Sequence, residues 1–151
     1  MTRMMVSAIF LILFLILSSC SSIHGIKYPP NFKFVDLTFA KGVNDQTVPA
    51  APINSSLTFS PKDEEVVAFL KLQNLWGKHI LKWDWYSPDS TLYYSTGNYS
   101  IQSADGKYFK EIAAWHRISI RGEKAANLIG VWVVNIFLDN ALVASRKFKL
   151  E

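Results

Sequence analysis

The stretch from Gly130 to Leu150 decides the fold, and it reads GVWVVNIFLDNALVASRKFKL. It holds two apolar, β-branched runs joined at Asp139-Asn140, and both of these residue types tolerate the left-handed backbone of a tight hairpin turn. Alternate residues of a strand point to one face. The first run therefore gathers Trp132, Val134, Ile136 and Leu138 on one face, and the second returns Phe148 and Leu150 to it while Lys147 and Lys149 point away. The sequence predicts a central β-hairpin with a buried Trp132.

Five further segments have the composition of strands, and turn residues separate them. They are residues 32–40, 66–74, 79–86, 91–95 and 114–121. The segment 66–74 also suits one face of a helix, but its apolar residues alternate with Lys71 and Gln73, which favours a strand. Residues 41–56 have the composition of a loop, and residues 97–112 show no clear pattern. About seven strands in total predict an all-β fold, a single antiparallel β-sandwich.

Three motifs follow one another along the predicted strands: WYSPD at residues 85–89, GVWVV at 130–134 and KFKL at 147–150. This order resembles the immunoglobulin-like domains of many bacterial envelope proteins. The resemblance spans residues 34 to 150 and implies an immunoglobulin-like sandwich. In such folds a tryptophan of the third strand packs across the core, and Trp83 is the candidate. The two cysteines that often flank it in immunoglobulin domains are absent from this sequence.

The N-terminus has the three parts of a secretory signal. Met1–Met5 carries Arg3 and no acid, Val6–Leu17 is apolar, and the small residues Ser18-Ser19-Cys20 follow. The apolar run is short for a helix that spans a bilayer, which needs about 20 residues. We expect residues 1–19 to form a helical signal peptide and residues 32–151 to form the β-sandwich domain.

Leu17-Ser18-Ser19-Cys20 resembles the lipobox of bacterial lipoproteins. In that family the cysteine sulfur receives a diacylglycerol, the chain is cut before the cysteine, and the new N-terminus is usually acylated with a fatty acid such as palmitate. The resemblance implies that Cys20 is lipidated and that residues 20–31 are a flexible tether. Ser21 follows the cysteine instead of aspartate, which implies an anchor in the bacterial outer membrane facing the periplasm. The alternative is an ordinary cleaved signal with a chance cysteine.

The charge and the cysteine count limit the possible partners. The net charge is +4, and the lysines and arginines are scattered along the chain. A solvated surface explains this distribution, so we expect no nucleic-acid partner. Cys20 is the single cysteine, which excludes an internal disulfide. His79 and His116 fall on apolar faces of different strands; a metal site would need at least one further ligand, so we expect both at the rim of the core.

The sequence carries no motif of an enzyme. It has no G-x-S-x-G, no H-E-x-x-H, and no free thiol once Cys20 is acylated. Asp84 and Asp89 flank a turn with no histidine near them in the sequence. We expect no catalytic activity and no cofactor.

The aromatic residues are the feature that most suggests binding. The alternation of Ala114–Arg121 sends Ile118 and Ile120 inward and predicts an outward stripe of Trp115, Arg117 and Arg121. Tryptophan and arginine are common at protein interfaces, and Arg117 would reach the face of Trp115. In the competing interpretation Trp115 covers a gap between the sheets and the arginines pair with Glu111 or Glu123.

Taken together, the anchor and the stripe suggest a membrane-anchored envelope lipoprotein that acts as a non-enzymatic protein-binding or assembly module. Two alternatives are an envelope glycan-binding module that uses exposed aromatics, and an accessory lipoprotein of a secretion machine. Structure separates the first two. A glycan binder would present a coplanar aromatic platform, and an assembly protein would present an apolar patch or an open sheet edge.

Overall fold

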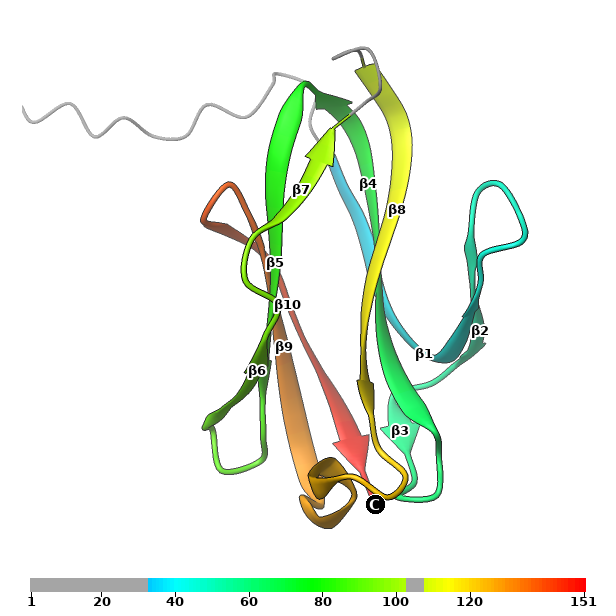
Figure 1. Cartoon of the computed structure of the whole chain (residues 1–151), viewed down its shortest axis with the longest axis vertical. Coiled ribbons are helices and arrows are strands. Elements are labelled where there is room, and N and C mark those ends of the chain that lie inside the picture. Colours follow the sequence, from blue (N-terminus) through cyan, green and yellow to red (C-terminus); the bar gives the residue numbers. More distant parts are fainter. Residues whose placement is uncertain (1–32, 103–107) are drawn as a thin grey trace, which may run out of the picture.

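The computed structural model describes residues 33–102 and 108–151, which form two β-sheets packed face to face (Figure 1). The predicted signal peptide, the lipidated Cys20 and the tether lie outside the described residues, as does a turn expected at Asp105-Gly106. Among the described residues, no helix has the length and apolar character needed to cross a membrane.

The two sheets contain ten strands in the described part of the chain. The four-stranded sheet has the order β2 (Ala51–Ser55), β1 (Lys33–Asn44), β4 (Glu65–Trp76) and β8 (Tyr108–Ser119). The six-stranded sheet has the order β3 (Thr58–Phe59), β10 (Ala141–Leu150), β9 (Gly130–Leu138), β5 (Lys78–Tyr86) and β6 (Leu92–Ser95), with β7 (Tyr99–Gln102) also paired to β5. β3 and β10 are parallel, and the other pairs are antiparallel. A 3₁₀ turn, η1 (Lys124–Asn127), precedes β9.

This strand order confirms the predicted immunoglobulin-like sandwich. In immunoglobulin domains strands A, B and E are neighbours in one sheet, and C, F and G are neighbours in the other. Here β1, β4 and β8 take the first set of places and β5, β9 and β10 the second, in the same chain order. β6 lies beside β5, where variable-type domains add an extra strand.

The hairpin of β9 and β10 forms as the sequence predicts. Asp139 and Asn140 have φ angles of 50° and 67°, and two positive φ values in a two-residue turn are the signature of the type I′ hairpin. The register places Trp132 opposite Phe148. Both side chains are buried, while Lys147 and Lys149 are exposed. β9 pairs with β5 on its other side, so the hairpin does lie at the centre of its sheet.

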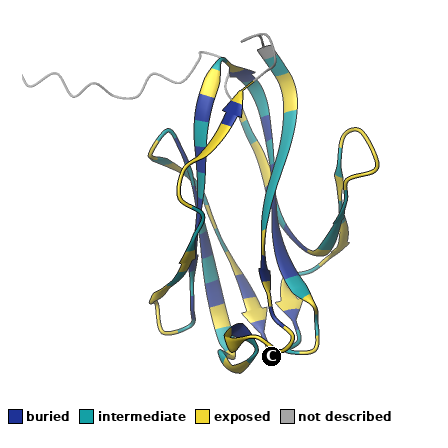
Figure 2. Cartoon of the chain, viewed as in Figure 1, coloured by how far each residue is buried: buried dark blue, intermediate teal, exposed yellow. Residues whose placement is uncertain are grey.

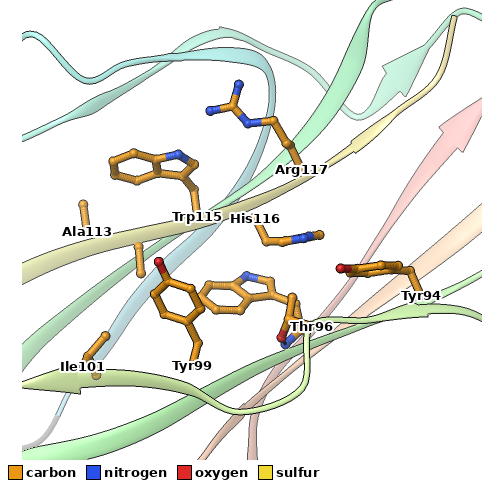
Figure 3. Close-up of a pocket in the computed structure, with 10 residues that line it drawn as sticks. Tyr94, Thr96, Tyr99, Ile101, Ala113, Trp115, His116 and Arg117 are labelled. Carbon is orange, nitrogen blue, oxygen red and sulfur yellow. Dashed lines mark hydrogen bonds between the residues drawn. The ribbon is translucent and has the colours of Figure 1, made fainter.

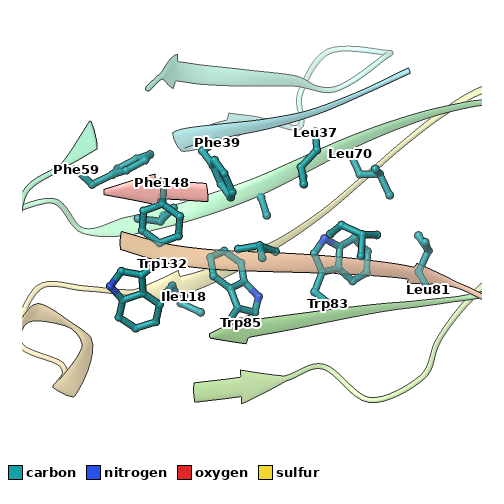
Figure 4. Close-up of a cluster of buried hydrophobic side chains, with 14 of the residues drawn as sticks. Leu37, Phe39, Phe59, Leu70, Leu81, Trp83, Trp85, Ile118, Trp132 and Phe148 are labelled. Atoms are coloured by element: carbon teal, nitrogen blue, oxygen red, sulfur yellow. The ribbon is translucent and has the colours of Figure 1, made fainter. Parts of the chain in front are cut away.

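Aromatic rings fill the space between the sheets (Figure 4). Trp83 and Trp85 of β5 and Trp132 of β9 are buried, which confirms the core positions predicted for Trp83 and Trp132. The Phe148 ring stacks on Trp132 at 5.9 Å and contacts Phe39 of the opposite sheet at 5.0 Å. Such ring pairs contribute about 0.5–1.5 kcal/mol each beyond the burial of their area. Phe148 therefore joins the central hairpin to the facing sheet.

Three expectations about the strands are wrong. The expected count of about seven is too low, partly because residues 41–56 contain the end of β1 and all of β2. Pro52 of β2 favours a loop in the sequence, but an edge strand tolerates proline. Most residues of β2 are exposed, as expected for an edge strand (Figure 2). Alternation along residues 32–40 predicts that Val35 shares the inward face of Leu37 and Phe39. Val35 is instead 38% exposed, because the register of β1 shifts between Phe34 and Asp36.

Candidate functional site

The described part of the sandwich is open along one side, between the edge strand β8 of one sheet and strands β6 and β7 of the other. β8 pairs with β4 alone among the described strands, and β6 and β7 each pair with β5 alone. A cavity of about 550 Å³ lies between them (Figure 3). We call it the edge groove. Its lining residues are Trp83, Tyr94, Thr96, Tyr99, Ile101, Ala113, Ala114, Trp115, His116 and Arg117.

The outer edge of β8 presents backbone groups beside this groove. The Ile120 N–H donates to the Glu64 carbonyl at 2.8 Å, and the register of β4 and β8 runs without a shift from there to Trp76 and Tyr108. In an antiparallel pair, alternate residues direct their N–H and C=O toward the partner strand. Residues of even number on β8 therefore face β4, so the backbone groups of Ala113, Trp115 and Arg117 point to the free side.

His116 connects the two sheets at this open side. Trp85 Nε1 of the opposite sheet donates to His116 Nδ1 at 3.1 Å, and the Tyr94 ring stacks on the imidazole at 5.2 Å. Burial lowers the pKa of His116, and the nearby positive charge of Arg117 lowers it further. The ring is therefore neutral at pH 7, and because Nδ1 accepts a hydrogen bond, the proton lies on Nε2.

The groove contains a buried hydrogen-bond donor with no partner. Trp83 is 2% exposed, and no described residue accepts from its Nε1. The other two buried tryptophans are satisfied, since Trp85 donates to His116 and Trp132 Nε1 donates to the Leu128 carbonyl at 2.9 Å. Buried donors in proteins are nearly always paired, so the Trp83 indole needs an explanation.

The structure separates the predicted stripe into three different environments. Trp115 is half-buried and stacks on Phe69 of β4 at 5.9 Å. Arg117 pairs with both carboxylate oxygens of Glu65, at 3.2 and 3.3 Å. Arg121 lies beyond the end of β8 and pairs with Glu64. The predicted contact of Arg117 with the face of Trp115 is replaced by the Glu65 pair.

The competing interpretation of the stripe holds in part: each arginine pairs with a glutamate, but Trp115 stacks on Phe69 of its own sheet and not across a gap between the sheets. Both arginines pair with glutamates, but with Glu64 and Glu65 rather than Glu111 or Glu123. Two of the three stripe residues, Trp115 and Arg117, line the edge groove.

The two histidines have separate structural partners. His79 Nδ1 contacts Asp139 Oδ2 at 2.6 Å, and its Nε2 contacts the Trp76 carbonyl at 2.7 Å. These contacts tie β5 to the turn between β9 and β10. No cluster of three His, Cys, Asp or Glu side chains that could hold a metal ion occurs within residues 33–102 and 108–151.

Comparison with known proteins adds information about the fold alone. No protein-family model matches the sequence, and no curated protein matches it. Among solved structures, the chain is similar to alkylpurine DNA glycosylase AlkC of Pseudomonas fluorescens bound to DNA with an abasic site analogue, at a TM-score of 0.50 and 12% identity. The match covers 80% of this chain but 30% of the glycosylase chain.

A second similar structure is an immunoglobulin-like protein from Pseudomonas aeruginosa. It has a TM-score of 0.41 and 12% identity, with 83% of this chain and 95% of that chain covered. At these identities a likeness carries no information about activity or ligand. The edge groove and the outer edge of β8 are therefore the features that bear on function.

Proposed function

We propose that the protein is a lipid-anchored module of the bacterial cell envelope that binds a partner protein and catalyses no reaction. The partner contributes an extended segment, which pairs with β8 as an additional strand. The anchor is Cys20, the membrane is the outer membrane, and the module faces the periplasm. Nucleic acid is not a ligand in this proposal, because the cationic groups of the groove and stripe are already paired with carboxylates.

The outer edge of β8, which pairs with no strand within residues 33–102 and 108–151, is the observation that supports this function best. The strand is 12 residues long, and its outward backbone groups lie beside a groove lined by aromatic and small side chains. Backbone pairing gives affinity when a peptide adds to a sheet edge, and pockets for alternate side chains give specificity. A long unprotected edge is otherwise a risk of aggregation that proteins avoid, so its retention favours a binding role.

The protein-binding hypothesis fits the groove better than the glycan hypothesis. A glycan site would need exposed rings in one plane. The rings that stack near the groove are Tyr94 on His116 and Trp115 on Phe69, and the stacking covers one face of Tyr94 and one face of Trp115. The glycan and secretion-machine alternatives stay predictions.

A photo-crosslinking experiment in cells tests the proposed function. A benzoylphenylalanine at position 117, on the free edge of β8, is compared with one at position 131, which is exposed on β9. We expect adducts with one defined protein from position 117 alone. Ala113→Pro removes one outward N–H of β8, so it should abolish the adducts while leaving the melting temperature nearly unchanged.

Two results would reject strand addition at β8. One is equal crosslinking from positions 117 and 131. The other is an adduct that persists at full yield in folded Ala113→Pro protein.

A further inference from the structure

The edge groove has the properties of a pocket for one side chain of a bound strand. When a strand adds to β8, its residues opposite Ala114 and His116 share the inward face with them. Ala114 is the smallest inward-facing residue of β8 in the lining, so its side chain fills little of the groove. A side chain opposite Ala114 would enter between β8 and Tyr99 of β7, which approaches from the other sheet (Figure 3).

The lining favours an uncharged side chain. Arg117 is its one residue that carries a full charge, and Glu65 neutralises it. His116 is neutral at pH 7, because burial lowers its pKa and its Nδ1 accepts a hydrogen bond from Trp85. A carboxylate or an ammonium group placed here would lose its hydration without gaining a free opposite charge.

The lining also requires a hydrogen-bond acceptor. Trp83 lines the groove, and its Nε1–H lacks an acceptor among the described residues. Tryptophan is a donor only. A ligand that supplies an oxygen would therefore form a hydrogen bond without displacing one that the protein already makes.

We propose that the edge groove accepts one uncharged side chain of the added strand, an amide or a hydroxyl, whose oxygen accepts a hydrogen bond from Trp83 Nε1. This inference rests on the proposed function, because strand addition to β8 brings the side chain to the groove. Trp83 is then a specificity-determining residue, and the recognised segment is extended, with an asparagine, glutamine, serine or threonine opposite Ala114.

The test uses the full chain purified in detergent, labelled with ¹⁵N in its backbone and tryptophan side chains. The probes are nine-residue peptides of alternating lysine and valine, whose side chains carry no hydrogen-bond acceptor, with one central guest, either asparagine or leucine. The asparagine and leucine side chains have nearly the same shape, but only asparagine has an oxygen that accepts a hydrogen bond. Peptide titrations followed by NMR report strand addition through the amides of Ala113 and Trp115, and pocket occupation through the Trp83 indole.

We expect the asparagine peptide to bind roughly five to ten times more tightly than the leucine peptide, as one buried hydrogen bond allows. It should move the Trp83 indole resonance downfield, whereas the indoles of Trp85 and Trp132 should stay in place because their donors are occupied. Trp83→Phe keeps a ring in the core and removes the donor. It should bind both peptides with equal affinity.

The outcomes separate this inference from the function on which it rests. If both peptides shift the β8 amide resonances equally and leave the Trp83 indole resonance unchanged, the result supports strand addition and rejects the side-chain pocket. If neither peptide shifts the β8 amides, both proposals are rejected. The indole measurement is made on the unsubstituted protein, so the test holds even if Trp83→Phe does not fold.

Discussion

His116 shows how one residue can couple the two sheets to pH. Its backbone belongs to β8, and its ring accepts a hydrogen bond from Trp85 of the opposite sheet. Only the neutral ring can accept through Nδ1, because a protonated imidazole donates at both nitrogens. Protonation therefore breaks a contact that crosses the core beside the edge groove.

Acid should destabilise the protein through this residue. The pKa of His116 is lower in the folded state than the ordinary value of 6.5, so the unfolded chain binds the proton more readily. The contribution of His116 to stability is therefore fully present well above pH 6.5 and is lost as the pH falls through 6.5 toward the folded pKa. We expect the urea midpoint to drop between pH 7 and pH 5.

The matched control for this prediction is His116→Gln, whose amide oxygen can accept the Trp85 hydrogen bond at every pH. The pH-dependent drop in the urea midpoint should be smaller in this variant. An identical drop in both proteins would mean that His116 does not cause the effect.

At the level of elements, the central hairpin depends on one glycine. Gly130 opens β9 with a φ of 135°, and a Cβ atom there would lie 2.9 Å from Pro88 Cβ. Proline is rigid, so the clash adds to the backbone strain. We expect Gly130→Ala to lower the free energy of unfolding by about 1–3 kcal/mol, as overpacking typically does.

Gly42 provides the control for Gly130, since it lies within β1 and a Cβ atom there would meet Ile53 at an ordinary 3.9 Å. Gly42→Ala should be neutral or slightly stabilising, because alanine restricts the unfolded chain. Urea denaturation measures the free energy of unfolding of both variants. Equal effects would mean that Pro88 does not hold Gly130 in its conformation.

Trp132 is the element-level anchor of the core. It is fully buried, stacks on Phe148 and donates to the Leu128 carbonyl. Trp132→Ala should lower the free energy of unfolding by about 3–5 kcal/mol, measured by denaturant titration. Trp76, which is 56% exposed, is the comparison. Trp76→Ala should lower the free energy of unfolding much less than Trp132→Ala does. Similar decreases in the two variants would mean that Trp132 is not packed in the core.

The sequence predicts these elements well where a side-chain pattern and a turn agree. Asp139-Asn140 and the alternation around it specify the hairpin together, and both are local signals. β4 gives a weaker signal because Val66–Leu70 is buried on both faces, which removes alternation and makes a helix plausible. β2 gives almost no signal, since its residues are mostly exposed and its pairing comes from β1.

At the scale of the whole molecule, the two sides of the sandwich differ. On one side Arg146 of β10 binds Asp36 and the Leu37 carbonyl of β1, which links the sheets. On the other side β8 and the β6–β7 strands leave the edge groove between them. The groove could not be predicted from the sequence, because Trp83, Tyr94, Tyr99 and His116 come from four strands. The sequence indicated only two residues of the groove lining, Trp115 and Arg117, through the alternation that places them outward on β8.

The location of the whole molecule can be tested at Cys20. Its sulfur is the single possible site for a thioether-linked lipid, since the chain has one cysteine, and stable anchoring needs more than one acyl chain. Cys20→Ala should remain unlabelled when cells are fed a fatty-acid analogue, and its precursor should stay uncut. Cys20→Ser is the conservative control and should behave in the same way. Equal labelling of the mutants and the wild type would reject the lipoprotein hypothesis.

The position of β9 in the six-stranded sheet has a consequence for biogenesis. Trp83 of β5 pairs with Ile136 of β9, and Thr58 of β3 pairs with Lys149 of β10. A chain made or translocated from its N-terminus thus presents the tryptophans of β5 long before their neighbours arrive. Sequence-distant pairing of this kind slows folding and leaves apolar surface exposed in the meantime. The nascent chain is therefore a natural client for a holding chaperone, and it can complete its core only after β9 and β10 have emerged.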